Sequence, residues 1–130
     1  MVEKMRISEL AKLAGVTPRT IRYYEGLGLL EASEREGTGF RYYTENELAR
    51  LQKINLLKTL GLTLDEISTV IPLLFEEPRK LAGKQMLLDI LKEHLQTIDR
   101  QVDSLTQHRT ELQERIKLIQ RWLDSQPVDK

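Results

Sequence analysis

Apolar residues in the C-terminal half of the chain recur at alternating steps of three and four positions, the heptad pattern of a coiled-coil helix. The series runs without a phase slip through Leu88, Leu91, Leu95, Ile98, Val102, Leu105, Arg109, Leu112, Ile116, Ile119 and Leu123. It predicts a helix over residues 84–123, about 60 Å long at about 1.5 Å per residue. The small domain before it cannot bury such a helix. We therefore expect the same helix of a second copy as its partner, because a two-fold interface uses one surface twice.

Residues beside this seam favour an antiparallel pair. If Leu87 faces Trp122 of the second copy, the bulky apolar residues beside the seam meet at both ends of the coil, whereas a parallel pair would stack each residue on its own copy. In that register Arg109, which interrupts the apolar seam, lies opposite Ile98 and near Asp99 of the other chain. A salt bridge there would fix the register. The predicted dimer interface therefore includes Trp122 as well as the seam.

Two short helical patterns open the chain. Ser8 is expected to cap a helix over residues 9–14, and Gly15 to end it. Its inward-facing residues are expected to be Leu10, Ala11 and Leu13. A second helix begins at Thr17, a good N-cap, with Pro18 in the first helical position. Helix, glycine turn and helix is the spacing of a helix-turn-helix, whose second helix enters the DNA major groove.

The second helix, within the stretch TPRTIRYY, carries cationic side chains at its N-terminal end. Arg19 and Arg22 are three positions apart and share one face, with Ile21 as the expected anchor to the core. Acidic residues are absent from this stretch until Glu25. Two guanidinium groups on such a face suit base edges and phosphates in a major groove. The alternative is a short surface helix whose arginines are simply solvated.

Two short segments around Gly37 and Gly39 are expected to pair as a hairpin, which we call the wing. Its cationic and hydroxyl side chains are Arg35, Arg41, Tyr42 and Tyr43. They would lie beside the second helix, where a phosphate backbone would pass. The alternative is an ordinary solvated loop.

Two capping boxes start the next helices. Thr44 with Glu47 begins a helix that Gly61 ends, and Thr63 with Glu66 begins a shorter helix that Pro72 is expected to end. Apolar residues at helical spacing follow each box, so both helices are expected to complete the core. The segment 73–83 is interpreted as a linker.

Composition restricts the chemistry. Lysine plus arginine and aspartate plus glutamate number 20 each, so any case for nucleic acid must rest on where the charges lie. The chain has no cysteine, which excludes disulfides and thiolate metal sites and fits a reducing cytoplasm. Since no stretch is apolar enough to span a bilayer and no cleavable leader is evident, we expect a cytoplasmic protein without a membrane partner.

Candidate catalytic and metal-binding residues are few. His94 and His108 stand about 21 Å apart along one helix and cannot share a metal within one chain. Ser8, Thr17 and Thr63 are better explained as caps than as nucleophiles, because the first ninety or so residues contain no histidine to activate them. We expect no enzyme, no metal and no cofactor.

Three motifs, RISELAKLAGVTPRTIRYYEGLGLL, GTGFRYYTENELARL and LGLTLDEI, occur in this order. In sequence and spacing they resemble the DNA-binding domain of the MerR family of bacterial transcriptional regulators, over roughly the first seventy residues. The long helix after them is similar to the antiparallel dimerisation coiled coil of that family. The resemblance implies a winged helix-turn-helix domain in a homodimer.

What the resemblance implies for single residues follows from matching positions. Arg19 and Arg22 are expected to reach base edges. The residues expected to contact phosphate are Thr17, Tyr24, Arg35, Arg41 and Tyr43. Phe40 stands where the family often has tyrosine, so a phosphate contact from that hydroxyl is lost.

We therefore predict a mainly helical regulator with a winged helix-turn-helix domain over residues 1–72, a linker over 73–83, a coiled-coil helix over 84–123 and a short tail over 124–130. The family resemblance implies binding to a palindromic operator, bending and untwisting of promoter DNA, and an indirect effect on RNA polymerase. A small-molecule effector, if there is one, is not identified by the sequence. The alternatives are a coiled-coil interaction module that does not bind DNA, and an architectural or recombination accessory protein.

Overall fold

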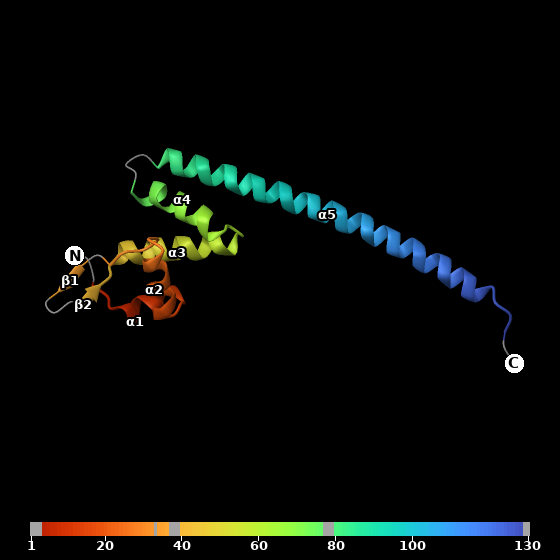
Figure 1. The fold of residues 1–130 in the computed structure, drawn as a ribbon, viewed down its shortest axis with the longest axis horizontal. Helices are drawn as coiled ribbons and strands as arrows, with labels where there is room; N and C mark the ends of the chain where they lie inside the picture. The colour runs from red at the N-terminus through yellow and green to blue at the C-terminus, as the bar shows by residue number, and fades with distance from the viewer. Residues whose placement is uncertain (1–3, 33, 37–39, 77–79, 129–130) are drawn as a thin grey trace. The chain divides into compact units, whose positions relative to one another are not determined.

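The computed structural model describes residues 4–32, 34–36, 40–76 and 80–128, and its ribbon is mostly helical (Figure 1). In chain order the elements are α1 (Ile7–Ala14), α2 (Pro18–Gly26), β1 (Glu34–Glu36), β2 (Phe40–Tyr42), α3 (Glu45–Thr59), α4 (Leu64–Phe75) and α5 (Leu81–Asp124). The predicted fold, mainly helical with a small hairpin and one long C-terminal helix, is confirmed. The chain divides into two compact units, Met1–Leu91 and Lys92–Lys130. We call the first unit the N-terminal domain.

The wing is present as an antiparallel pair of short strands. β1 and β2 pair in the register Glu34↔Tyr42, Arg35↔Arg41 and Glu36↔Phe40. Gly37 and Gly39, expected in the turn, lie outside the described residues. Directly after β2, Tyr43 forms a β-bridge with Met5, in which the Met5 N–H donates to the Tyr43 carbonyl at 2.7 Å and the Tyr43 N–H to the Met5 carbonyl at 2.8 Å. The wing is therefore fastened to the segment that leads into α1.

The start of α1 differs from the prediction. Arg6 is the N-cap and no side chain caps the helix, so the prediction that Ser8 caps it is wrong. The bridge at Met5 fixes the chain just before the helix, which places Ser8 inside the first turn. Gly15 ends α1 as predicted, in the left-handed conformation at φ 71°. The prediction that Leu13 faces inward is wrong, because Leu13 is 59% exposed.

Both predicted capping boxes are confirmed. The Thr44 N–H donates to Glu47 Oε1 at 2.7 Å, and the Thr63 N–H donates to Glu66 Oε1 at 2.9 Å. Between them Gly61, at φ 98°, allows the turn from α3 into α4. These caps satisfy backbone donors that the first turn of each helix leaves unpaired.

The prediction that Pro72 ends the helix is wrong. α4 continues to Phe75 with Pro72 inside it. A proline there removes one backbone hydrogen bond, but the extra turn carries Leu74 into the core, where only 7% of it is exposed. Much of the predicted linker is therefore helical, because residues 73–75 close α4 and residues 81–83 open α5. Residues 77–79 lie outside the described residues.

The hydrophobic core of the N-terminal domain is formed by the four helices α1, α2, α3 and α4, together with the first turns of α5. Its completely buried aliphatic side chains include Leu10, Ile21, Leu51, Ile54, Ile67, Val70 and Ile71. The residues of α5 that pack against this core are Met86, Leu87, Ile90 and Leu91. Gly83 permits the approach, because a Cβ atom there would lie 2.9 Å from the carbonyl carbon and oxygen of Leu73. The first turns of α5 therefore belong to the domain.

Beyond Leu91, none of the described residues of α5 is buried. Its predicted seam residues between Leu95 and Leu123, with Trp122 beside them, are exposed. Among the described residues, no helix combines the length and apolar content needed to cross a bilayer. This part of α5 therefore has a regular, exposed apolar stripe.

Candidate nucleic-acid interface

The local sequence fixes both the start and the orientation of α2. The Thr17 hydroxyl accepts the Thr20 N–H at 3.1 Å, and Pro18 occupies the first turn. Ile21 and Tyr24 are buried on the opposite side of the helix. Because these two anchors set the rotation of the helix about its axis, other side chains of α2 must face solvent.

Arg19, Arg22 and Tyr23 occupy the exposed face of α2. The first turn contains no acidic residue, and neither arginine forms an ion pair with any residue that the structure describes. The N-terminal end of a helix also carries partial positive charge. This face therefore offers two free guanidinium groups to an external anion or base edge, as the sequence predicted.

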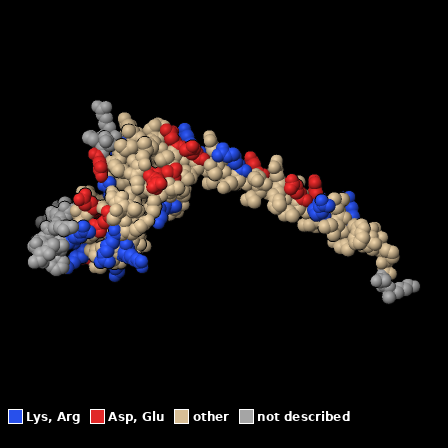
Figure 2. All heavy atoms as spheres, viewed as in Figure 1, with Lys and Arg blue, Asp and Glu red and all other residues tan. Residues whose placement is uncertain are grey.

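Basic side chains gather on one side of the N-terminal domain. Figure 2 shows lysine and arginine along the lower edge of the domain, where Figure 1 places α1 and α2, while acidic side chains lie mainly above them. The whole chain is neutral, so this separation of charge creates a positive face without a net positive charge. Such a face suits a phosphate backbone.

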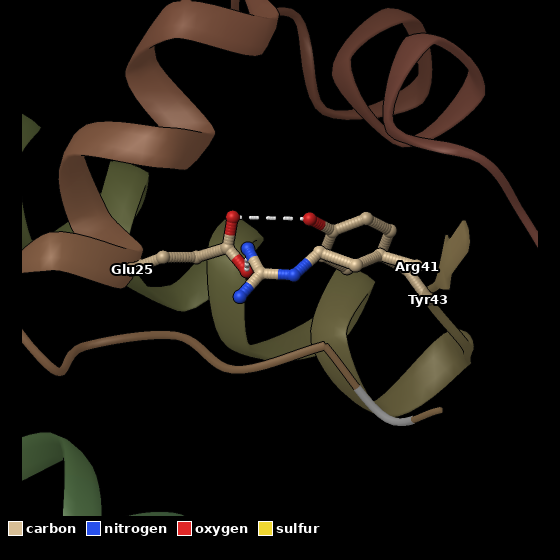
Figure 3. A network of polar contacts seen from close by, with 3 residues as sticks. All are labelled: Glu25, Arg41 and Tyr43. Carbon is tan, nitrogen blue, oxygen red and sulfur yellow. Dashed lines mark hydrogen bonds and ion pairs between the residues drawn. The ribbon is translucent and has the colours of Figure 1, made fainter. Parts of the chain in front are cut away.

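A carboxylate at the end of α2 holds two side chains of the wing (Figure 3). Arg41 Nη1 donates to Glu25 Oε2 at 3.1 Å, and the Tyr43 hydroxyl donates to Glu25 Oε1 at 3.0 Å. Burial, together with the hydrogen bond and negative charge of Glu25, raises the pKa of Tyr43 to about 12, although nearby Arg41 opposes the shift. The phenol therefore stays neutral and acts as a donor at ordinary pH.

The residues predicted to contact phosphate lie in different environments in the structure. Tyr24 and Tyr43 are buried side chains, 2% and 1% exposed, and the Tyr24 hydroxyl accepts the Lys58 ammonium at 3.1 Å. Both hydroxyls thus have partners within the domain, and their contacts with phosphate stay predictions. The Thr17 hydroxyl caps α2. The side chain of Arg35 lies outside the described part of the structure.

Several cationic residues near this face were not found from the sequence. The Lys4 ammonium and the Arg6 guanidinium lie 5.6 and 5.9 Å from the centre of the Tyr42 ring in the wing. Lys58, from α3, lies behind α2 and contacts Tyr24. Their places depend on the Met5 bridge and on packing between helices, which no local motif encodes.

Comparison with known proteins places these elements in a family context. A family model described as MerR HTH family regulatory protein matches residues 5–74, and one described as MerR, DNA binding matches residues 48–124. The nodulation protein NolA of Bradyrhizobium sp. (strain NC92) is 41% identical over 109 residues, which are 84% of this chain but 42% of that protein. The uncharacterized HTH-type transcriptional regulator PA4778 of Pseudomonas aeruginosa is 34% identical over 116 residues, 89% of this chain and 86% of its own length.

Solved structures show the same architecture. The regulator PbrR691 from Ralstonia metallidurans CH34, in complex with lead(II), superposes with a TM-score of 0.68 at 31% identity, covering 85% of this chain and 86% of its own. EcmrR, in a complex with DNA, superposes with a TM-score of 0.59 at 29% identity, covering 87% of this chain and 40% of its own. Both structures combine a related sequence with the same fold over most of this chain.

Proposed function

The chain belongs to the MerR family of DNA-binding transcriptional regulators, and from this we propose that it acts as a homodimer on a palindromic operator. In this proposal α2 of each copy enters the major groove of one half-site, and the wing rests on the neighbouring backbone. The observation that carries it is the exposed pair Arg19 and Arg22, which two buried residues of the same helix turn outward without an intramolecular partner among the described residues.

The partner proposed for α5 is the α5 of a second copy in antiparallel orientation. The support is the seam of exposed leucine, isoleucine and valine from Leu95 to Leu123. Arg109 also lies exposed within it, where it could pair with Asp99 of the second copy. Leu87 and Leu91 are partly buried against the domain core, so we place the main contact between copies beyond Leu91. Leu88, 45% exposed, could still contribute at its edge.

On promoter DNA, the dimer would act through the shape of the duplex. Bending a site of promoter length costs about 1 to 6 kcal/mol, which contacts from two half-sites can offset. Bending and untwisting would present the promoter differently to RNA polymerase, without requiring a direct contact between the proteins. The proposal places the protein with promoter DNA in the bacterial cytoplasm and includes no resident cofactor.

The proposal is tested by removing one arginine from each part of the surface. Arg22→Ala should weaken operator binding by about 1 to 3 kcal/mol and leave binding to random DNA nearly unchanged, because a base contact is lost. Arg41→Ala should weaken binding to operator and random DNA alike, because a phosphate contact is lost. Affinities measured by fluorescence anisotropy over a range of salt concentrations would separate the two.

The matched control is Arg100→Ala, which removes an exposed arginine from α5 on the side opposite the seam. It should change neither affinity. An Arg22→Ala variant that loses operator and random DNA equally would contradict the proposed role of α2. A wild-type chain that does not prefer any DNA sequence would favour the interaction-module alternative.

A further inference from the structure

The Glu25 carboxylate joins α2 to the wing. Glu25 lies in the last turn of α2, and each of its oxygens has a different partner: Oε2 accepts from Arg41 in β2, and Oε1 accepts from Tyr43 just after β2. The two partners lie 16 and 18 positions further along the chain. One side chain therefore ties the end of α2 to β2 and to the residue that follows it (Figure 3).

Other described ties of the wing lead to a different part of the domain. Met5 bridges Tyr43 through the backbone, and the cations of Lys4 and Arg6 lie near the ring of Tyr42. These contacts fix the wing to the N-terminal segment, not to α2. The Glu25 contacts are therefore direct side-chain ties between the wing and α2 itself, in addition to the packing of α1 against α2.

The two side chains of the ion pair differ in exposure. The Glu25 side chain is 10% exposed, whereas that of Arg41 is 44% exposed. A guanidinium has five N–H donors, and Glu25 engages Nη1. The carboxylate therefore holds Arg41 from the inside and leaves the outer donors available to a phosphate. A buried carboxylate that also accepts from Tyr43 cannot easily move with the arginine.

We infer that Glu25 is a positioning residue that determines how strongly the protein distinguishes its operator from other DNA. This rests on the proposed function. In the operator complex, the base contacts of Arg19 and Arg22 fix where α2 lies in the groove, so Arg41 reaches its phosphate if the wing is held at the correct place. On random DNA the register is loose, and the charge of Arg41 contributes wherever a phosphate is near.

The decisive variant is Glu25→Gln, which has the same shape. Its amide oxygen can still accept from Tyr43, but it lacks the charge that holds Arg41. We expect the ratio of operator to random-DNA affinity to fall about tenfold, the scale of one misplaced charge-assisted contact, with random-DNA affinity unchanged or slightly higher. On the operator, the slope of log affinity against log salt should fall by about one for each protomer, because one phosphate contact is lost.

Two matched variants separate position from charge and from folding. Glu9→Gln neutralises an exposed carboxylate of α1 and should leave the affinity ratio unchanged. In the Arg41→Ala background, Glu25→Gln should have no further effect on the ratio, because the side chain that it positions is gone. Circular dichroism and thermal unfolding of each variant would verify that the domain is intact.

The outcomes are distinct. An unchanged ratio in Glu25→Gln would overturn the inference, and so would an equal fall in the Arg41→Ala background, since Glu25 would then act through the general structure of the domain. A wild-type chain without operator preference would instead refute the proposed function. The inference is supported if the wild type prefers the operator and Glu25→Gln reduces this preference when Arg41 is present but not in the Arg41→Ala background.

Discussion

The N-terminal domain and the rest of α5 use apolar residues in opposite ways. In the domain, side chains such as Leu10, Ile54 and Ile67 are completely buried by neighbours from the same chain. In α5 beyond Leu91, the apolar seam residues are between 50% and 68% exposed, although they recur just as regularly. The domain therefore has its stabilising contacts within one copy, whereas the helix has the pattern for such contacts but needs another copy to make them.

This difference predicts which property a substitution in each region should change. A change in the seam should alter assembly and leave the domain folded, and a change in the domain should do the reverse. The chain also carries suitable reporters, because its single tryptophan, Trp122, is on α5 and its four tyrosines lie between positions 23 and 43. Tryptophan fluorescence can follow the helix while tyrosine absorbance follows the domain.

The largest expected effect comes from a charge in the middle of the seam. Leu105→Glu removes from each copy a leucine that the proposed dimer would bury and places a carboxylate there, which should cost about 4 to 6 kcal/mol per dimer. The dissociation constant of the dimer should therefore rise at least about 1,000-fold. Sedimentation equilibrium would measure it, with tyrosine absorbance showing that the domain remains folded.

Gln107→Glu is the matched control for this change. It adds the same charge two positions along the chain, on the face opposite the seam, where the side chain is exposed. It should leave the dimer intact. If both variants dissociate equally, charge alone is responsible and the apolar seam is not the interface.

A smaller effect is expected inside the domain, where the start of α5 packs on α4. Gly83→Ala places a Cβ atom 2.9 Å from the Leu73 carbonyl carbon, which the α4 backbone must move to accept. Such overpacking costs about 1 to 3 kcal/mol, more than the better helix propensity of alanine returns. Thermal unfolding should show a lower midpoint for the tyrosine signal.

Gly26→Ala provides the comparison within the same domain. A Cβ atom at Gly26 meets nothing within 4 Å, so this change should be neutral or slightly stabilising. Equal midpoints for the two variants would show that α5 does not pack closely on α4 at Gly83.

The smallest expected effect is a pH dependence confined to the domain. The pKa of Tyr43 is raised from 10.0 to about 12, so the folded state favours the neutral phenol. Its contribution is complete below pH 10 and is lost as pH rises toward 12. We expect a loss of up to about 2 kcal/mol.

Tyr43→Phe isolates this contribution. The difference in unfolding free energy between wild type and Tyr43→Phe, from denaturant titrations at a series of pH values, should shrink between pH 10 and 12. A difference that stays constant over this range would show that burial and Glu25 do not raise the pKa of Tyr43.

Local patterns were sufficient for most of the fold. The capping boxes at Thr44 and Thr63 and the stop at Gly15 each depend on residues within one turn, and the heptad series lies within one helix. The sequence alone therefore predicted the elements that they define. The errors arose where distant contacts prevail. Burial of Leu74 extends α4 past Pro72, and the bridge from Met5 to Tyr43 displaces the expected cap of α1.

The distinction between local and distant contacts also explains which residues of the candidate site the sequence predicted. Arg19 and Arg22 share a face by helical spacing, which a sequence reveals directly. The role of Glu25 depends on partners 16 and 18 positions away, in a different element, and no helical or strand periodicity relates them. Its contacts could therefore be recognised only once the wing and α2 were placed in space.

The most direct test of the account is selection of bound fragments from a random DNA library by the wild-type chain, followed by sequencing. Two copies joined through α5, each presenting Arg19 and Arg22, predict enriched sequences that are inverted repeats with one fixed distance between half-sites. Enrichment of single half-sites without a fixed distance, or of no sequence at all, would contradict it.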